Sequence, residues 1–460
     1  MTRTLITAIV AAFAAGSLSA QASGEIPPPN EQPALHDMVA AVSAQRLEHD
    51  IARLVSFGTR HTLSDTNSTT RGIGAARRWI RQEFERISTD CGGCLEIMVI
   101  GDVISGEPRI PDPVEVINVI AIQRGTLEPD RFVMMSGDID SRVTDIMDST
   151  SDSPGANDNA SGMAGVIEAA RVLSRHKFAG SIIYAGLSGE EQGLFGGKIL
   201  AAHAIKRGWR IKAVLNNDMI GNIEGVNGVI NNTTARVFSE GTRKVETEKE
   251  ARMRRFTGGE VDSSSRNLAR YIDRLADRYI PNLDVMMVYR LDRFGRGGHH
   301  RPFNEVGFPG VRIMETNENY IRQHQDIRVE DGIHYGDVID GVDFNYAAKL
   351  TALNVVTLAS LAEAAPFPAD VTISGAVSPD TTLKWRRPEG RAAENLAGYR
   401  IYWRLTTAPQ WTDSRFVGDV TEFTLENVVI DNYFFGVASV SRQGYESPVV
   451  FPGPAGSFGN

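Results

Sequence analysis

The chain has 460 residues, of which 42% are hydrophobic and 23% are charged, and its formal net charge is −9. This composition is ordinary for a globular protein, and the length is too great for a single compact core, so two domains are expected. The negative charge argues against a nucleic-acid-binding protein, because phosphate contacts need clustered Lys and Arg.

The N-terminal stretch MTRTLITAIVAAFAAGSLSAQASG has the pattern of a secretory signal peptide. Arg3 gives a positive start, and a short apolar run follows over Leu5–Ala15. Ala20–Ala22 fits a cleavage site, with Leu18–Ala20 as a competitor. The run is too short for a comfortable membrane span, so we expect residues 1–22 to be removed and the protein to be secreted or periplasmic.

A Pro-rich lead-in is followed by helical patterns over 36–55 and 71–88, the second with apolar residues at helical spacing. Cys91 and Cys94, the two cysteines of the chain, then enclose a Gly-Gly pair. In an exported protein this spacing favours a local disulfide. Two cysteines alone cannot form a closed zinc site.

From here apolar strand patterns alternate with helical ones. Strands are expected at 114–125, 131–140, 181–191 and 211–221, with helices at 160–176 and 193–208. This alternation predicts an α/β fold with a mixed, largely parallel sheet flanked by helices. In such sheets ligands bind where the strands end.

The last third of the chain changes character. Residues 231–285 are polar and charged and are interpreted as an insertion in a domain that spans 23–364. A helix near 336–364 closes that domain. Short alternating strands over 365–453 then predict a small all-β sandwich, followed by a tail at 454–460.

The sandwich resembles a fibronectin type III domain. The resemblance is carried by Trp385 on an early strand, by the aromatic strand Tyr399–Trp403, and by NYFFGVASVS followed by GYES. Nothing in this domain looks catalytic. We expect it to position the protein on a surface, a protein partner or an extended substrate.

Carboxylates gather where the predicted strands of the larger domain end. The stretches are GDIDS at 137–141, PGANDNASG at 154–162, SGEEQGLFG at 188–196 and NNDMIG at 216–221, joined by His324 in RQHQD. Several acids in one crevice repel each other unless a cation neutralises them. An acid-rich pocket with a histidine therefore predicts a divalent metal, and oxygen and nitrogen ligands suit zinc in a hydrolase.

Residues 53–361 resemble the co-catalytic zinc exopeptidases of the aminopeptidase Y and bacterial leucyl aminopeptidase kind. Three of the stretches above match that family's motifs in the same order, and FGTRH at 57–61 and HHRPFNEVGFPGVRIME at 299–315 match its flanking segments. The resemblance implies two zinc ions bridged by Asp158. Glu191 and His324 would complete the shell of one ion, and Asp218 would bind the other.

Two further carboxylates have roles that the resemblance implies. Glu190 would be the general base that takes a proton from the attacking water and passes it to the leaving amine. Asp140 would be a second carboxylate that orients a metal ligand.

The sequence departs from the family at one ligand, since Asp138 stands where the pattern has histidine. Asp138 can bind the metal itself, and the extra negative charge would then favour a harder ion such as manganese. Alternatively the first metal is weak or absent, which leaves a single-zinc site like that of glutaminyl cyclases. The third hypothesis is a non-catalytic relative. We rank direct binding by Asp138 first, because Glu190, Glu191 and Asp218 are kept.

His300 and Phe303 match pocket-lining positions of the family and are predicted to face the substrate. His299 replaces an acid there and could balance the charge of Asp138. The expected activity is that of a secreted metal-dependent exopeptidase, an aminopeptidase acting on peptides with a free N-terminus. A glutaminyl cyclase-like acyltransferase and a non-catalytic relative remain the alternatives.

Overall fold

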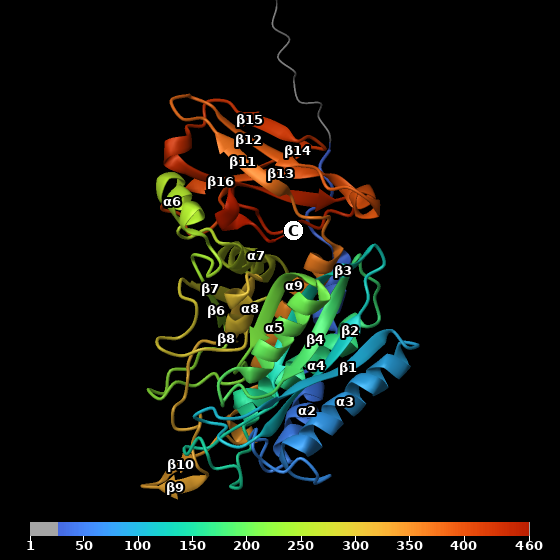
Figure 1. The fold of residues 1–460 in the computed structure, drawn as a ribbon, viewed down its shortest axis with the longest axis vertical. Coiled ribbons are helices and arrows are strands. Elements are labelled where there is room, and N and C mark those ends of the chain that lie inside the picture. The colour runs from blue at the N-terminus through green and yellow to red at the C-terminus, as the bar shows by residue number, and fades with distance from the viewer. Residues whose placement is uncertain (1–25, 460) are drawn as a thin grey trace, which may run out of the picture.

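The computed structural model describes residues 26–459, which form an α/β part and a smaller β part (Figure 1). The predicted signal peptide lies outside the described residues. No helix within 26–459 is long and apolar enough to span a membrane.

An eight-stranded sheet forms the centre of the larger part. Its spatial order is β1-β2-β4-β3-β5-β8-β6-β7. The strands are β1 (Leu95–Ile104), β2 (Val114–Gln123), β3 (Glu128–Asp138), β4 (Gly180–Leu187), β5 (Arg210–Asn217), β6 (Thr234–Ser239), β7 (Asp284–Val288) and β8 (Gly310–Glu315). Pairs β3–β4, β3–β5, β5–β8 and β6–β7 are parallel and the other three are antiparallel. The predicted mixed, largely parallel sheet is therefore confirmed.

Helices cover both faces of this sheet, which is why its central strands are apolar on both sides. Along β3, Val133 and Met135 face one core while Phe132 and Met134 face another. The first core takes residues from α1 (Pro33–Ala40), α2 (Ala44–Val55), α3 (Gly72–Asp90), α4 (Gly162–Leu173), α7 (Ser264–Tyr279) and α9 (Phe344–Glu363). The second takes residues from α5 (Phe195–Arg207) and α8 (His300–Glu305).

Residues 231–285 are only partly the surface insertion expected from their polarity. Strand β6, helix α7 and the start of β7 lie in this range and belong to the sheet and the core. Helix α6 (Glu248–Thr257) has no buried residue and is the exposed part. Alternation of charged and apolar residues on α7 concealed a helix that is buried on nearly all sides.

The smaller part consists of two three-stranded antiparallel sheets. One contains β11 (Ala369–Ser374), β12 (Thr381–Arg386) and β15 (Glu422–Leu425), and the other contains β14 (Asp413–Gly418), β13 (Leu396–Leu405) and β16 (Tyr433–Ser441). Trp385 and Tyr399 pack edge to face between them with ring centroids 5.1 Å apart. The fibronectin type III resemblance stays a prediction.

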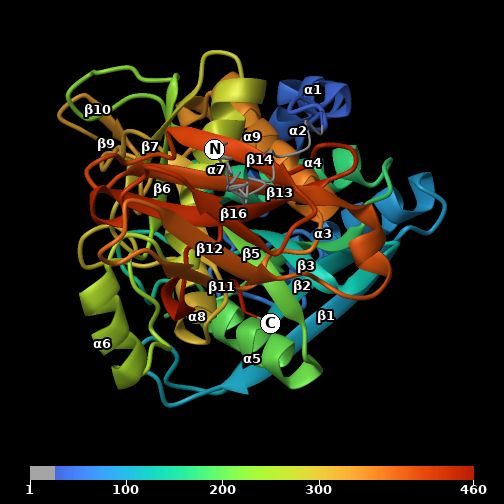
Figure 2. The ribbon, with the colours of Figure 1, turned by 90° about the horizontal axis from the view of Figure 1, so that it is seen from above.

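The two parts are packed together at α6 and α7, as seen in Figure 1 and from above in Figure 2. Residues of α7, α9 and the smaller sheets share one apolar core. Buried Asp262, just before α7, accepts hydrogen bonds from Arg270 at 2.8 Å and from Arg404 of β13 at 2.8 Å. The predicted tail is also packed, since Phe458 meets Phe367 edge to face.

Two short features complete the fold. Cys91 and Cys94 form the expected local disulfide, with an S–S distance of 2.07 Å. A hairpin of β9 (Arg328–Glu330) and β10 (Ile333–Tyr335) follows His324 and lies at the far end of the molecule from the smaller part (Figure 1).

Candidate active site

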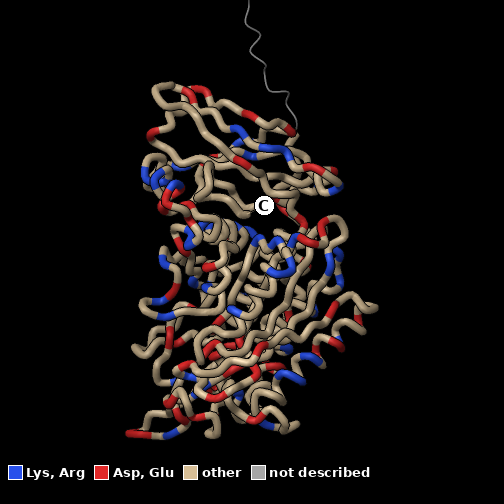
Figure 3. The backbone as a smooth tube through the Cα atoms, in the orientation of Figure 1, with Lys and Arg blue, Asp and Glu red and all other residues tan. Residues whose placement is uncertain are grey.

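The polar site lies where the central strands end, because two glycines allow the chain to come close there. A Cβ on Gly137 would lie 2.7 Å from the backbone of Gly162 and Met163, and one on Gly162 would lie 2.3 Å from the carbonyl oxygen of Asn217. The start of α4 therefore presses against the ends of β3 and β5. Figure 3 shows Asp and Glu residues gathered at this level of the larger part.

Three side chains from three separate loops form a compact group. Nε2 of His324 lies 2.9 Å from Oδ2 of Asp158 and 2.8 Å from Oε1 of Glu191. Ligand atoms of these three residues all lie within 4.8 Å of one another. Two carboxylates and one imidazole, with a fourth position left for water or substrate, are the donor set of a catalytic zinc site. The three residues therefore fit zinc.

The charges in this group explain why its members are drawn together. Burial would lower the pKa of His324, but the carboxylates of Glu191 and Asp158 raise it to about 9. Burial likewise opposes ionisation of Asp158, yet His324 and Gln323 bring its pKa well below the usual range. The two carboxylates thus remain charged beside a cation, as metal ligands must be.

Neighbouring side chains fix the orientation of the three ligands. Arg142 donates to Oε2 of Glu191 at 2.8 Å, and its Nη2 lies 2.6 Å from Nδ1 of His324. Gln323 donates to Oδ2 of Asp158 at 3.0 Å. Asp337 accepts the main-chain N–H of Asp158 at 2.7 Å. Such outer contacts set the direction of a ligand's lone pairs.

Glu190 and Asp140 lie beside the group. The main-chain N–H groups of Glu190 and Glu191 both donate to the Asp140 carboxylate, at 3.2 and 3.1 Å, and Thr62 adds a third bond at 3.0 Å. Asp140 therefore holds the turn that presents the two glutamates. Burial, and then the charge of Glu191, raise the pKa of the Glu190 carboxyl well above its ordinary value. A raised pKa suits a group that must accept and return a proton.

Asp138 is turned towards other partners. Its Oδ2 accepts a hydrogen bond from Asn159 at 2.8 Å, and its Oδ1 lies 2.5 Å from Nδ1 of His299. Both Asp138 and His299 are buried. The charge balance expected from His299 is therefore present as a direct contact.

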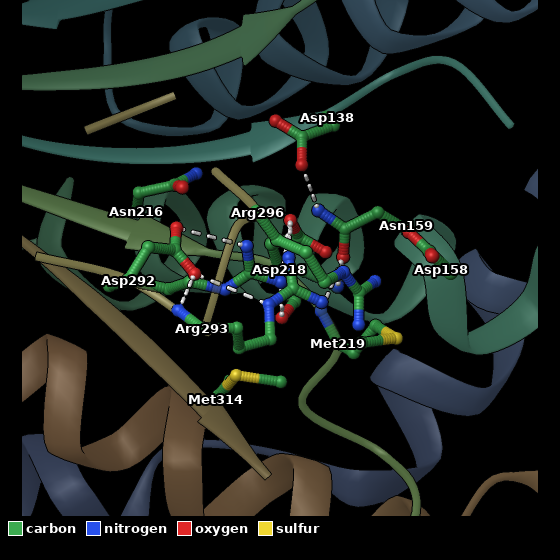
Figure 4. Close-up of polar contacts among 12 residues, drawn as sticks. Asp138, Asp158, Asn159, Asn216, Asp218, Met219, Asp292, Arg293, Arg296 and Met314 are labelled. Carbon is green, nitrogen blue, oxygen red and sulfur yellow. Dashed lines mark hydrogen bonds and ion pairs between the residues drawn. The ribbon is translucent and has the colours of Figure 1, made fainter. Parts of the chain in front are cut away.

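Asp218 is surrounded by arginines (Figure 4). Its Oδ2 lies 2.8 Å from Nη2 of Arg312 and 3.8 Å from Nη2 of Arg293. Burial raises the pKa of Asp218 to about 8, against the opposing effect of Arg312 and Arg293. Among residues 26–459, Asp138 and Asp218 belong to no group of three possible ligands within 4.8 Å. Their arrangement does not fit a second metal ion.

The two predicted pocket residues face the protein interior. Nε2 of His300 donates to the carbonyl oxygen of Leu291 at 2.8 Å, and burial lowers the pKa of His300 to about 4. Phe303 is fully buried in the core beneath α5. A substrate-lining role is therefore not supported for either, and His299 is the member of this segment that reaches the site.

The sequence interpretation overlooked the site's nitrogen donors, namely Arg142, Asn159, Arg293, Arg312 and Gln323. Arg312 carried a visible signal, because it is a charged residue inside the apolar strand Gly310–Glu315. A charge at such a position is rarely buried without a partner. Arg142 follows Asp140 by two residues and could have been found in the same way.

Comparison with known sequences gives consistent matches. Residues 118–328 match peptidase family M28. A probable zinc metalloprotease of Leptosphaeria maculans is 45% identical over 429 residues, which cover 93% of this chain and 98% of the relative. Another probable zinc metalloprotease, from Pyricularia oryzae, is 40% identical over 94% of this chain and 86% of its own length.

Solved structures share the fold at low sequence identity. The LapA aminopeptidase of Legionella pneumophila aligns with a TM-score of 0.53 and 18% identity, covering 77% of each chain. LapB from the same organism aligns with a TM-score of 0.52 and 18% identity, covering 73% of this chain and 77% of its own.

Proposed function

The chain belongs to peptidase family M28, with zinc metalloproteases as relatives, and on that premise we propose that it is an exopeptidase, specifically an aminopeptidase. The observation that carries the proposal is the group of Asp158, Glu191 and His324 with Glu190 beside it. The motif resemblance supports the choice of aminopeptidase, as does the likeness to the Legionella aminopeptidase.

The site residues divide the work between binding and proton transfer. Asp158, Glu191 and His324 would hold the ion, which when bound would polarise the substrate carbonyl and lower the pKa of a water molecule. Glu190 takes the proton of the attacking water and returns it to the leaving amine. Asp140 keeps Glu190 in place through the main chain of the 190–191 turn.

A second candidate is a single-zinc glutaminyl cyclase-like acyltransferase. It is favoured by one observation, that the ligand atoms form a group of three without Asp138 and Asp218. In that reaction the substrate's own α-amine attacks its side-chain amide, so Glu190 would move a proton between two groups of one substrate. Water would not be consumed.

The experiment is a panel of aminoacyl fluorogenic amides and a peptide with N-terminal glutamine, each assayed with and without chelator. The aminopeptidase proposal expects release of the fluorophore that chelator abolishes and zinc restores. Cyclisation of the glutamine peptide without amide hydrolysis would favour the acyltransferase. No turnover of either substrate by zinc-loaded protein would favour a non-catalytic relative.

Glu190→Gln identifies the base in the same assays. The rate is expected to fall by about 10²–10⁴-fold with metal content unchanged. Glu426→Gln, at an exposed glutamate of the smaller part, is the matched control and should keep the full rate. An unchanged rate for Glu190→Gln would show that another group moves the proton.

We also propose export and a positioning role for the smaller part. The pattern at residues 1–22 supports a cleaved signal peptide, and mass spectrometry of the mature N-terminus tests it. The fibronectin type III resemblance supports binding to a surface or protein partner. Loss of binding to a natural substrate mixture, with unchanged turnover of small amides, is expected when exposed residues of that domain are altered.

A further inference from the structure

We propose that the chain binds one divalent metal ion, at Asp158, Glu191 and His324, and that Arg312 and Arg293 balance the charge of Asp218 in place of a second ion. The identity of the ion as zinc rests on the proposed function. The number of ions rests on contacts within this chain.

Arg312 holds a fixed cation against Asp218. Its side chain is fully buried, and Nη2 lies 2.8 Å from Oδ2 of Asp218 and donates to the Asp218 carbonyl oxygen at 3.2 Å. Nη1 donates to the carbonyl oxygen of Gly297 at 2.8 Å and lies 3.4 Å from Oδ2 of Asp292. A guanidinium cannot lose its proton in a protein and is locked in its plane by these bonds.

Arg293 brings a second positive charge to the same carboxylate. It lies 3.8 Å from Oδ2 of Asp218 and is held from behind by Asp292 at 3.2 Å and Glu318 at 3.3 Å. A divalent ion on Asp218 would therefore face two guanidinium groups within a few ångströms. Like charges at such distances in a buried site repel strongly.

Asp138 has exchanged a metal for two protein partners. Asn159 donates to one of its oxygens and His299 lies against the other. His299 is itself fully buried, so the contact is not an accident of a mobile surface side chain. Substitution of histidine by aspartate at this position and the arrival of Arg312 and His299 are thus two sides of one change, because each new negative group has a new positive neighbour.

The test is metal content measured on the full-length mature protein. The protein is stripped with chelator, dialysed against buffered zinc, and analysed by inductively coupled plasma mass spectrometry. Wild type is expected to hold one zinc per chain. Asp218→Asn should also hold one with unchanged affinity, whereas Asp158→Asn should lose zinc binding by at least 100-fold.

Two zinc ions in wild type, one of them lost in Asp218→Asn, would overturn the inference and leave the peptidase proposal standing. Conversely, a protein with one zinc that cleaves no peptide would overturn the peptidase proposal alone. If Asp218→Asn does not fold, a titration of stripped wild type with Co²⁺, followed by visible absorption, decides the number. A single equivalence point at one ion per chain supports the inference, and a second at two overturns it.

Discussion

Replacing Asp262 by asparagine is expected to loosen the joint between the two parts of the molecule. Asp262 is fully buried, as are both of its arginine partners, Arg270 on α7 and Arg404 on β13. The carboxylate is thus shared by two guanidinium groups from opposite sides of the joint. No water-exposed charge is available to take its place within this cluster.

The magnitude follows from what the substitution leaves behind. Breaking a buried ion pair by removing one partner costs about 3–5 kcal/mol, because the remaining charge is uncompensated. Asparagine keeps one acceptor oxygen, and Arg270 keeps its hydrogen bonds to the carbonyl oxygens of Val261 and Pro409. We therefore expect a loss near the lower limit, about 3 kcal/mol.

The assay is urea unfolding followed by tryptophan fluorescence, since Trp411 lies at the joint and donates to Asn267 at 3.2 Å. Asp419→Asn is the control, because its ion pair with Arg387 has side chains that are 46% and 38% exposed. Such a pair contributes about 0–1 kcal/mol. A loss below 1 kcal/mol for Asp262→Asn would refute the reasoning that this pair holds the two parts together.

Three further outcomes are expected. Chelation of the metal should lower the melting temperature, because Asp158 and Glu191 then face each other without a cation, and zinc at 100 times its dissociation constant should restore about 2.7 kcal/mol. Glu240→Gln should raise stability at pH 8 by about 1–3 kcal/mol and leave it unchanged at pH 4. The sign follows because burial raises the pKa of Glu240 from 4.5 to about 7, so the folded protein loses stability as the pH rises through that interval. Thr62→Val should lower turnover several-fold without changing zinc content, since it removes one of the three bonds that hold Asp140; equal losses of zinc and turnover would contradict a positioning role.

The architecture was predictable because its signals are local. Apolar runs such as the one ending at Asp138 are buried on both faces, and helices between them read with the expected period. Even the site's location followed, since Asp158, Glu191 and His324 come together as the ends of neighbouring strands require. Helix α7 was missed because its charged residues, Arg266 and Arg270 among them, are buried in ion pairs rather than solvated.

What could not be predicted was the state of each carboxylate. Asp158 and Asp218 occur in similar loop sequences, yet one faces an imidazole and the other faces arginines from segments more than 70 residues away. A resemblance transfers positions from a family, but it does not transfer the neighbours that the fold brings to them. His300 shows the same limit, since one residue along the chain decides whether a histidine reaches the site or the core.

The joint and the site are connected through one side of the sheet. Helix α7 packs on β6, β7 and β8, and β8 carries Arg312, while the loop before α8 carries Arg293 and His299. The smaller part holds α7 through Asp262 and therefore supports the half of the site where arginines face Asp218. Asp158, Glu191 and His324 come instead from loops at the opposite end of the larger part (Figure 1). Loosening the joint should accordingly disturb substrate turnover before it disturbs zinc binding, which identifies the β sandwich as a structural support for the arginine side of the site.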